Sequence, residues 1–175
     1  MPDSSSYTSH PPLVNKVAKS GLVTIDLEGY HSDQPLTGFD LKDYLYMDLM
    51  LREKEFRQAL QEHDWSRYNG HILSVYCSAN AIVASWAYML VTQHAVPYTA
   101  RVVFGSPESN TFEPFRAGLE GENWQRFAGK RVLLKGCAGR EIPPSVYLFA
   151  TQKLMPVAER IMYGEACSFV PVWRK

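Results

Sequence analysis

The hexapeptide WSRYNG at Trp65–Gly70 is followed 59 residues later by WQRFAG at Trp124–Gly129. Both fit the pattern W-x-R-[Y/F]-x-G. The same offset aligns 13 identical residues over the 50 positions of 56–105 and 115–164. Unrelated segments would share roughly 3 residues over this length, so the match indicates an internal repeat. The alternative, two ordinary βαβ units of similar composition, accounts less well for identities in a constant register.

Each copy of the repeat predicts the same succession of elements. A polar-amphipathic segment indicates a helix, and the Trp-to-Gly hexapeptide leads into an apolar run whose length and β-branched content predict a buried strand. A second helix and a short strand follow. The predicted first helices are Lys54–His63 and Glu113–Glu122, and the strands are His71–Cys77, Arg101–Phe104, Lys130–Gly136 and Arg160–Tyr163.

Strand–helix–strand units with short links predict parallel strand pairs. With a further strand expected at Leu22–Asp26, the predicted fold is α/β, with tandem-duplicated α-β-α-β units forming one mostly parallel sheet that carries helices on its faces. We expect residues 1–13 to be a disordered tail and residues 14–175 to form a single α/β domain with internal repeats 54–105 and 113–164. Residues 31–38 are expected to be a loop, and 40–51 stay open between helix and strand. The helix at Val83–His94 is apolar nearly all round and is therefore expected to be sandwiched.

The composition narrows the classes of partner. Lys plus Arg and Asp plus Glu number 18 each, so the formal net charge is zero. This balance argues against nucleic acid or an anionic membrane as the main partner, while a protein partner stays open. The polar N-terminus lacks the apolar core of a signal peptide, so we expect a cytoplasmic protein. The oligomeric state does not follow from the sequence.

Three cysteines are the candidate ligands. Cys77 and Cys137 each end the first predicted strand of a copy, and Cys167 follows the last predicted strand. The carboxyl ends of parallel strands share one edge of a sheet, where open α/β sheets place their ligands. We therefore expect the three thiols to converge there and to hold zinc or an iron–sulfur cluster, because soft sulfur ligands favour these species. The fourth ligand is open between Glu165, water and an external group.

Two alternatives for the cysteines stay open. Free cysteine often behaves as a small buried hydrophobe, so all three can be structural in a protein-binding scaffold. A thiol-dependent enzyme is the third hypothesis, although no local basic group lowers the pKa of a thiol and no candidate base lies nearby in the sequence. Nucleotide-binding, zinc-protease and serine-hydrolase motifs do not occur.

Other conspicuous residues are interpreted structurally. The repeated Trp65 and Trp124 are predicted to be packing anchors. His94 and its counterpart Lys153 fall at the ends of predicted helices, where a cation complements the helix C-terminus.

Several blocks of the chain resemble a known bacterial family. They are VNKVAKSGLVTIDLE (Val14–Glu28), REKEFR (Arg52–Arg57), HDWSRY (His63–Tyr68), YCSANAIV (Tyr76–Val83) and IMYGEACSFVP (Ile161–Pro171). These blocks are similar to the Bacteroidetes-type family called "domain of unknown function 2480". The resemblance implies no activity, but it implies a link to iron–sulfur assembly. Our leading hypothesis is a cytosolic, non-enzymatic accessory protein that holds zinc or an iron–sulfur species through Cys77, Cys137 and Cys167.

Overall fold

The structure is a computed structural model, and it describes residues 21–135 and 139–175. The chain divides into two compact units. The first contains the described part of Met1–Ile25 together with Trp124–Lys135 and Thr151–Lys175. The second contains Asp26–Asn123 and the described part of Gly136–Ala150. The predicted tail at 1–13 lies outside the described residues, and the expectation of a single domain stays a prediction.

A three-stranded parallel sheet organises the second unit. Its order is β2-β3-β4, formed by Leu36–Asp40, Ile72–Tyr76 and Arg101–Phe104. Leu36 pairs with Ile72, and Ile72 pairs with Arg101. Strand β3 is buried along almost its whole length, as expected for a central parallel strand covered on both faces.

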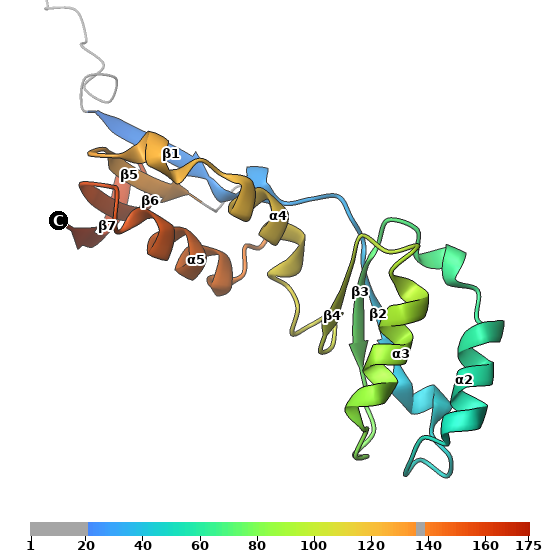
Figure 1. The fold of residues 1–175 in the computed structure, drawn as a ribbon. Helices are drawn as coiled ribbons and strands as arrows, with labels where there is room; N and C mark the ends of the chain where they lie inside the picture. The colour runs from blue at the N-terminus through green and yellow to red at the C-terminus, as the bar shows by residue number, and fades with distance from the viewer. Residues whose placement is uncertain (1–20, 136–138) are drawn as a thin grey trace, which may run out of the picture. The chain divides into compact units, whose positions relative to one another are not determined.

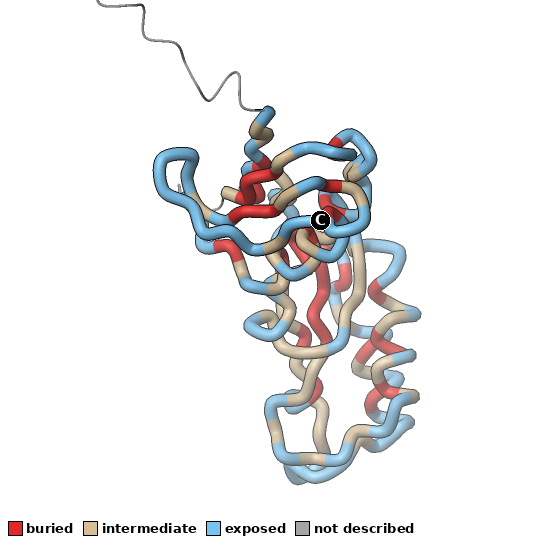
Figure 2. The backbone as a smooth tube through the Cα atoms, turned by 90° about the vertical axis from the view of Figure 1, so that its left-hand side faces the viewer, coloured by how far each residue is buried: buried red, intermediate tan, exposed pale blue. Residues whose placement is uncertain are grey.

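Two helices lie side by side next to this sheet (Figure 1). They are α2 (Glu53–Glu62) and α3 (Ser85–Ala95). Phe56 and Leu60 of α2 join a core made by Phe39, Leu73 and Val75 of the strands. Figure 2 shows the buried positions concentrated along strands and on one side of the helices. The expectation that α3 is sandwiched is wrong, because Met89 is 70% exposed.

A four-stranded sheet has the order β1-β5-β6-β7. The strands are Leu22–Asp26, Arg131–Lys135, Arg160–Glu165 and Ser168–Arg174. Strands β5 and β6 are parallel, whereas β7 turns back and runs antiparallel to β6. The associated helices are α4 (Glu113–Gly121) and α5 (Pro144–Leu154). Helix α5 begins at the proline expected in its first turn, where a missing N–H costs no hydrogen bond.

The predicted mixed α/β class and the parallel pairs β3–β4 and β5–β6 are confirmed. The prediction of one shared sheet is wrong, because the strands form two sheets. Strand β2, at the end of the expected loop, lies beside β3, and β1 lies beside β5. Each central strand therefore already has two neighbours, and the ladder hydrogen bonds that would join the copies are used locally.

Short 3-10 helices follow the first strand of each sheet. They are η1 (Leu27–Tyr30) and η2 (Leu41–Tyr44), and similar turns, η3 (Trp65–Tyr68) and η4 (Trp124–Phe127), occupy the repeated hexapeptides. The undecided stretch 40–51 is thus neither helix nor strand, but η2 followed by a turn closed by a bridge between Tyr46 and Met50. Over the described part of the chain, no helix has the length and apolar character needed to cross a membrane.

Candidate functional site

The two described cysteines both lie just past strand ends. Cys77 directly follows β3, is half-buried, and its thiol is 3.7 Å from the carbonyl oxygen of Ala79. Cys167 is exposed and lies in the tight turn between β6 and β7. The expectation that it follows the last strand is wrong, because β7 comes after it. Cys137 lies outside the described residues.

The premise for a three-thiol site has changed. Cys77 follows a strand of the β2-β3-β4 sheet, whereas Cys167 follows a strand of the other sheet. One sheet edge therefore does not gather all three positions, and their convergence stays a prediction. Within residues 21–135 and 139–175, no group of three or more His, Cys, Asp or Glu side chains is arranged to hold a metal ion.

The suggested fourth ligand already has a charged neighbour. The Glu165 carboxylate lies 4.0 Å from the ammonium group of Lys135, across the carboxyl ends of β5 and β6. Both side chains are partly exposed, so this ion pair is weak and leaves Glu165 able to take another partner.

A hydrogen-bonded histidine lies in the second unit. Nδ1 of His63 is 3.3 Å from the hydroxyl of Tyr44, and Nε2 is 3.2 Å from the hydroxyl of Tyr68. Burial, and then the nearby charge of Arg67, lowers the pKa of His63. A neutral imidazole has one donor and one acceptor nitrogen, so one tyrosine hydroxyl accepts a hydrogen bond from it and the other donates one.

Aromatic rings hold this histidine in place. Phe39 of β2 stacks on Tyr44 and on Trp65, with ring centroids 5.3 Å apart in both pairs, and meets the His63 ring edge-on. Burial also raises the pKa of both tyrosines. A pocket of about 210 Å³ opens beside the cluster, lined by residues of β2, η2 and η3 that include Asp40, Asp43, Tyr44, His63, Arg67 and Tyr68.

Asp40 connects this cluster to the loop that carries Cys77. Its carboxylate accepts hydrogen bonds from the backbone N–H groups of Lys42 at 3.0 Å and Ser78 at 2.9 Å. Burial alone would raise the pKa of Asp40, but the bonds from Ser78 and Lys42 outweigh it and the pKa is lowered. The ionised side chain therefore fixes the backbone immediately after Cys77.

The sequence interpretation missed this cluster and its counterpart. IDLEGY (Ile25–Tyr30) and FDLKDY (Phe39–Tyr44) share three residues in register, and this second repeat was the available signal. Asp26 caps η1 as Asp40 caps η2. The Tyr30 hydroxyl donates to Glu122, which lies 59 residues after His63. The repeated framework therefore carries a histidine at one position and a glutamate at the equivalent one.

The predicted structural roles are partly confirmed. Trp65 is 6% exposed, and its indole N–H donates to the carbonyl of Leu60 at 2.8 Å. Trp124 is only half-buried, so it is a weaker anchor than expected. His94 lies in the last turn of α3, as predicted, and it also stacks on Trp65.

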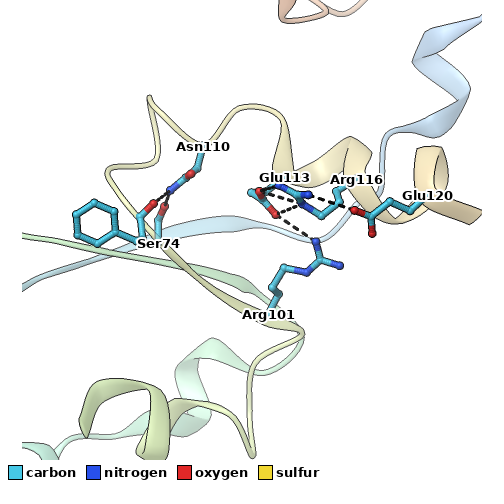
Figure 3. A network of polar contacts seen from close by, with 7 residues as sticks. Ser74, Arg101, Asn110, Glu113, Arg116 and Glu120 are labelled. Carbon is cyan, nitrogen blue, oxygen red and sulfur yellow. Dashed lines mark hydrogen bonds and ion pairs between the residues drawn. The ribbon is translucent and has the colours of Figure 1, made fainter. Parts of the chain in front are cut away.

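A buried carboxylate ties β4 to α4 (Figure 3). Glu113 is 8% exposed and bonds to Arg116 at 2.7 Å and to Arg101 at 3.2 Å. Hydrogen bonding from Arg116 is the main influence on the pKa of Glu113, and with Arg101 it lowers that pKa despite burial. Arg116 also reaches Glu120 at 3.1 Å. These contacts are saturated ion pairs, which suit a structural role.

Comparison with known proteins identifies one family. The profile described as "Protein of unknown function (DUF2480)" matches residues 11–175, which is essentially the whole chain. No curated protein and no solved structure matches. The description names no reaction or ligand, so a function has to be argued from the residues themselves.

Proposed function

The chain belongs to the DUF2480 family, and from its thiols we propose that it is an accessory protein that holds zinc or an iron–sulfur species through Cys77, Cys137 and Cys167. The exposure of Cys167 carries the proposal. Free cysteine is among the most buried residue types when its role is structural, yet this one lies exposed in a two-residue turn. An inert core role does not explain that position.

The geometry around Cys167 supports a ligand role. The β6–β7 hairpin pairs from Arg160 with Arg174 to Glu165 with Ser168, so the turn that carries the thiol is anchored on both sides. A site on rigid elements loses little conformational entropy when it binds. Thiolate is a soft ligand that favours zinc and iron–sulfur species over hard cations such as magnesium.

Cys77 adds a second accessible thiol. It is half-buried rather than buried, and the bonds of Asp40 fix the loop that follows it. The described hydrogen-bond acceptor of its thiol is a backbone carbonyl, not a side-chain base. This favours a ligand over an activated nucleophile, because a catalytic thiol needs a base or a lowered pKa.

Two finer features belong to the same proposal. A tandem duplication is supported by the aligned hexapeptides and by the equivalent Tyr30–Glu122 and Tyr44–His63 contacts. A cytoplasmic location suits the thiols, because reducing compartments keep cysteines unpaired. The iron–sulfur alternative is the one the family resemblance favours.

Anaerobic purification followed by elemental analysis and a visible spectrum tests the proposal. We expect about one metal or cluster equivalent per chain, and Cys167→Ser should remove it while the circular dichroism spectrum is unchanged. Ser168→Ala is the matched control, because it changes the adjacent residue without removing a thiol. A protein that stays metal-free after anaerobic reconstitution with zinc or iron and sulfide contradicts the proposal. So does equal metal retention by Cys167→Ser.

A protein-binding scaffold is a second candidate, favoured by the turn after η2. Met47, Leu49 and Met50 are between 56% and 72% exposed there. Met47 and Asp48 have positive φ angles of 52° and 57°, which non-glycine residues rarely adopt. Clustered exposed apolar side chains mark interaction surfaces, and methionine adapts to varied partners.

In-cell crosslinking distinguishes this candidate. Replacing Met47 and Leu49 together by serine should remove specific crosslinked partners while metal content is unchanged. Met89→Ser, equally exposed on α3, is the control and should leave the crosslinks in place. Identical crosslinks for all three proteins would contradict a scaffold role for this turn.

A further inference from the structure

The outer edge of β4 has no strand paired with it in the part of the chain that the structure describes. Its counterpart in the repeat is β6, which begins 59 residues later, at Arg160 instead of Arg101. Strand β7 covers the outer edge of β6 by antiparallel pairing. The first unit thus shows what kind of neighbour this edge accepts, namely an antiparallel strand.

The chain itself diverts the segment that would cover β4. Both strands reach a glycine with positive φ, 110° at Gly105 and 121° at Gly164. After Gly164 the chain turns back as β7. After Gly105 it instead crosses the face of the sheet, where the Asn110 amide donates to the Ser74 hydroxyl at 2.7 Å. The edge of β4 is therefore left open by a built feature of the fold.

Both ends of β4 are held in place (Figure 3). At the start, Arg101 bonds to Glu113 at 3.2 Å, and at the end the Phe104 carbonyl accepts from Asn110 at 3.0 Å. These bonds hold the strand in its extended conformation. A strand that is already ordered pays little entropy when another strand pairs with it.

The middle of β4 directs hydrogen-bonding groups outward. The N–H of Ala100 donates to the carbonyl of His71 on the β3 side. Successive residues of a strand direct their N–H and C=O groups to opposite sides, so those of Arg101 and Val103 face the open edge. Gly105, with its positive φ, breaks this alternation by donating to Val75.

This edge lacks the usual protection against pairing. Native edge strands carry proline or lysine to block association, and β7 has Pro171. The four residues of β4 include neither, and the charge of Arg101 is engaged by Glu113. Phe104 is 75% exposed beside Tyr88, whereas its counterpart Tyr163, next to β7, is 40% exposed.

We propose that the occupant of this edge is a second copy of the chain, with two β4 strands pairing antiparallel about a twofold axis at Val103. A twofold interface requires a self-complementary surface, and β4 provides one. Val103 would face its own copy and exchange two backbone hydrogen bonds with it. Val102 would face Phe104 of the other copy. Arg101 would face Gly105, so the two arginines do not meet.

Sedimentation equilibrium of the full chain tests the dimer. We expect a concentration-dependent species of twice the 19.9 kDa chain mass. Val103→Pro removes the outward N–H and should give a monomer. Phe104→Lys places a charge opposite Val102 and should raise the dissociation constant by about tenfold. Because Phe104 is exposed, this second variant keeps the test valid if the proline variant does not fold.

Ile82→Lys is the matched control. Its side chain is 95% exposed and it is not in β4, so the dimer should persist. In addition, oxidised Val103→Cys should yield a crosslinked dimer joined through position 103, which peptide mass spectrometry can identify. A protein that stays monomeric at all concentrations overturns the proposal. So does a dimer that Phe104→Lys and folded Val103→Pro leave unchanged, since its interface must lie elsewhere.

Discussion

Replacing Trp65 by alanine perturbs the best-packed ring of the repeat. The indole is 6% exposed, stacks on Phe39 and on His94, and donates a hydrogen bond to the carbonyl of Leu60. Removing a buried aromatic side chain costs about 3–5 kcal/mol, from lost burial and from the cavity that remains. The loss of the indole N–H also leaves a buried carbonyl without its partner, which places the cost in the upper half of that range.

Urea unfolding followed by circular dichroism measures this loss. With a slope of about 1.5 kcal/mol per molar urea, the midpoint should fall by roughly 2–3 M. Trp124→Ala is the internal control, because the equivalent ring is only half-buried and should cost about 1–2 kcal/mol. If Trp65→Ala costs less than about 1 kcal/mol, or no more than Trp124→Ala, the packing argument fails.

Three further predictions concern charge and backbone. Glu113→Gln should cost about 1–3 kcal/mol in urea unfolding, limited by the partial exposure of its arginine partners, whereas exposed Glu120→Gln should change stability by less than about 0.5 kcal/mol; equal effects would contradict the ion-pair assignment. Gly105→Ala should destabilise the protein by about 1–3 kcal/mol, because φ is +110° and the new Cβ would lie 2.7 Å from the Ser109 hydroxyl. Gly29→Ala, with open space around it, is the comparison and should be nearly neutral. Because burial, and then the charge of Arg67, lowers the pKa of His63, the unfolded chain binds a proton first as the pH falls. Stability should therefore be complete above about pH 6.5 and decline below it, and His63→Gln should reduce that decline; an unchanged pH profile would remove His63 as its source.

Local patterns predicted the individual elements well. Strands Leu22–Asp26 and Arg101–Phe104 have the bounds expected from their apolar runs, and α5 begins at Pro144 as its proline pair indicated. These features depend on short-range rules, because backbone geometry and side-chain burial act over a few residues. Strand β2 was missed because Gly38 and the charged ends of FDLKDY weaken its apolar pattern.

The candidate site was less predictable than the elements. The positions of Cys77 and Cys167 after strands followed from the sequence, whereas the exposure of Cys167 required β7, a strand that the apolar pattern did not suggest. The Tyr44–His63–Tyr68 contacts join segments 19 and 5 residues apart, and no spacing rule indicates them. Only the packing of Phe39 against η2 and η3 brings those groups within hydrogen-bonding distance.

The sequence by itself determined the order of helices and strands, the internal similarity and the residues of each core, because these depend on local periodicity and composition. Tertiary structure alone decided which strands became neighbours. Leu22–Asp26 and Leu36–Asp40 are similar in sequence, yet one lies beside β5 and the other beside β3. Strand pairing is a competition among distant segments of similar backbone chemistry, and long-range contacts select its outcome. That competition separated the two sheets, turned β7 onto β6 and left the edge of β4 open.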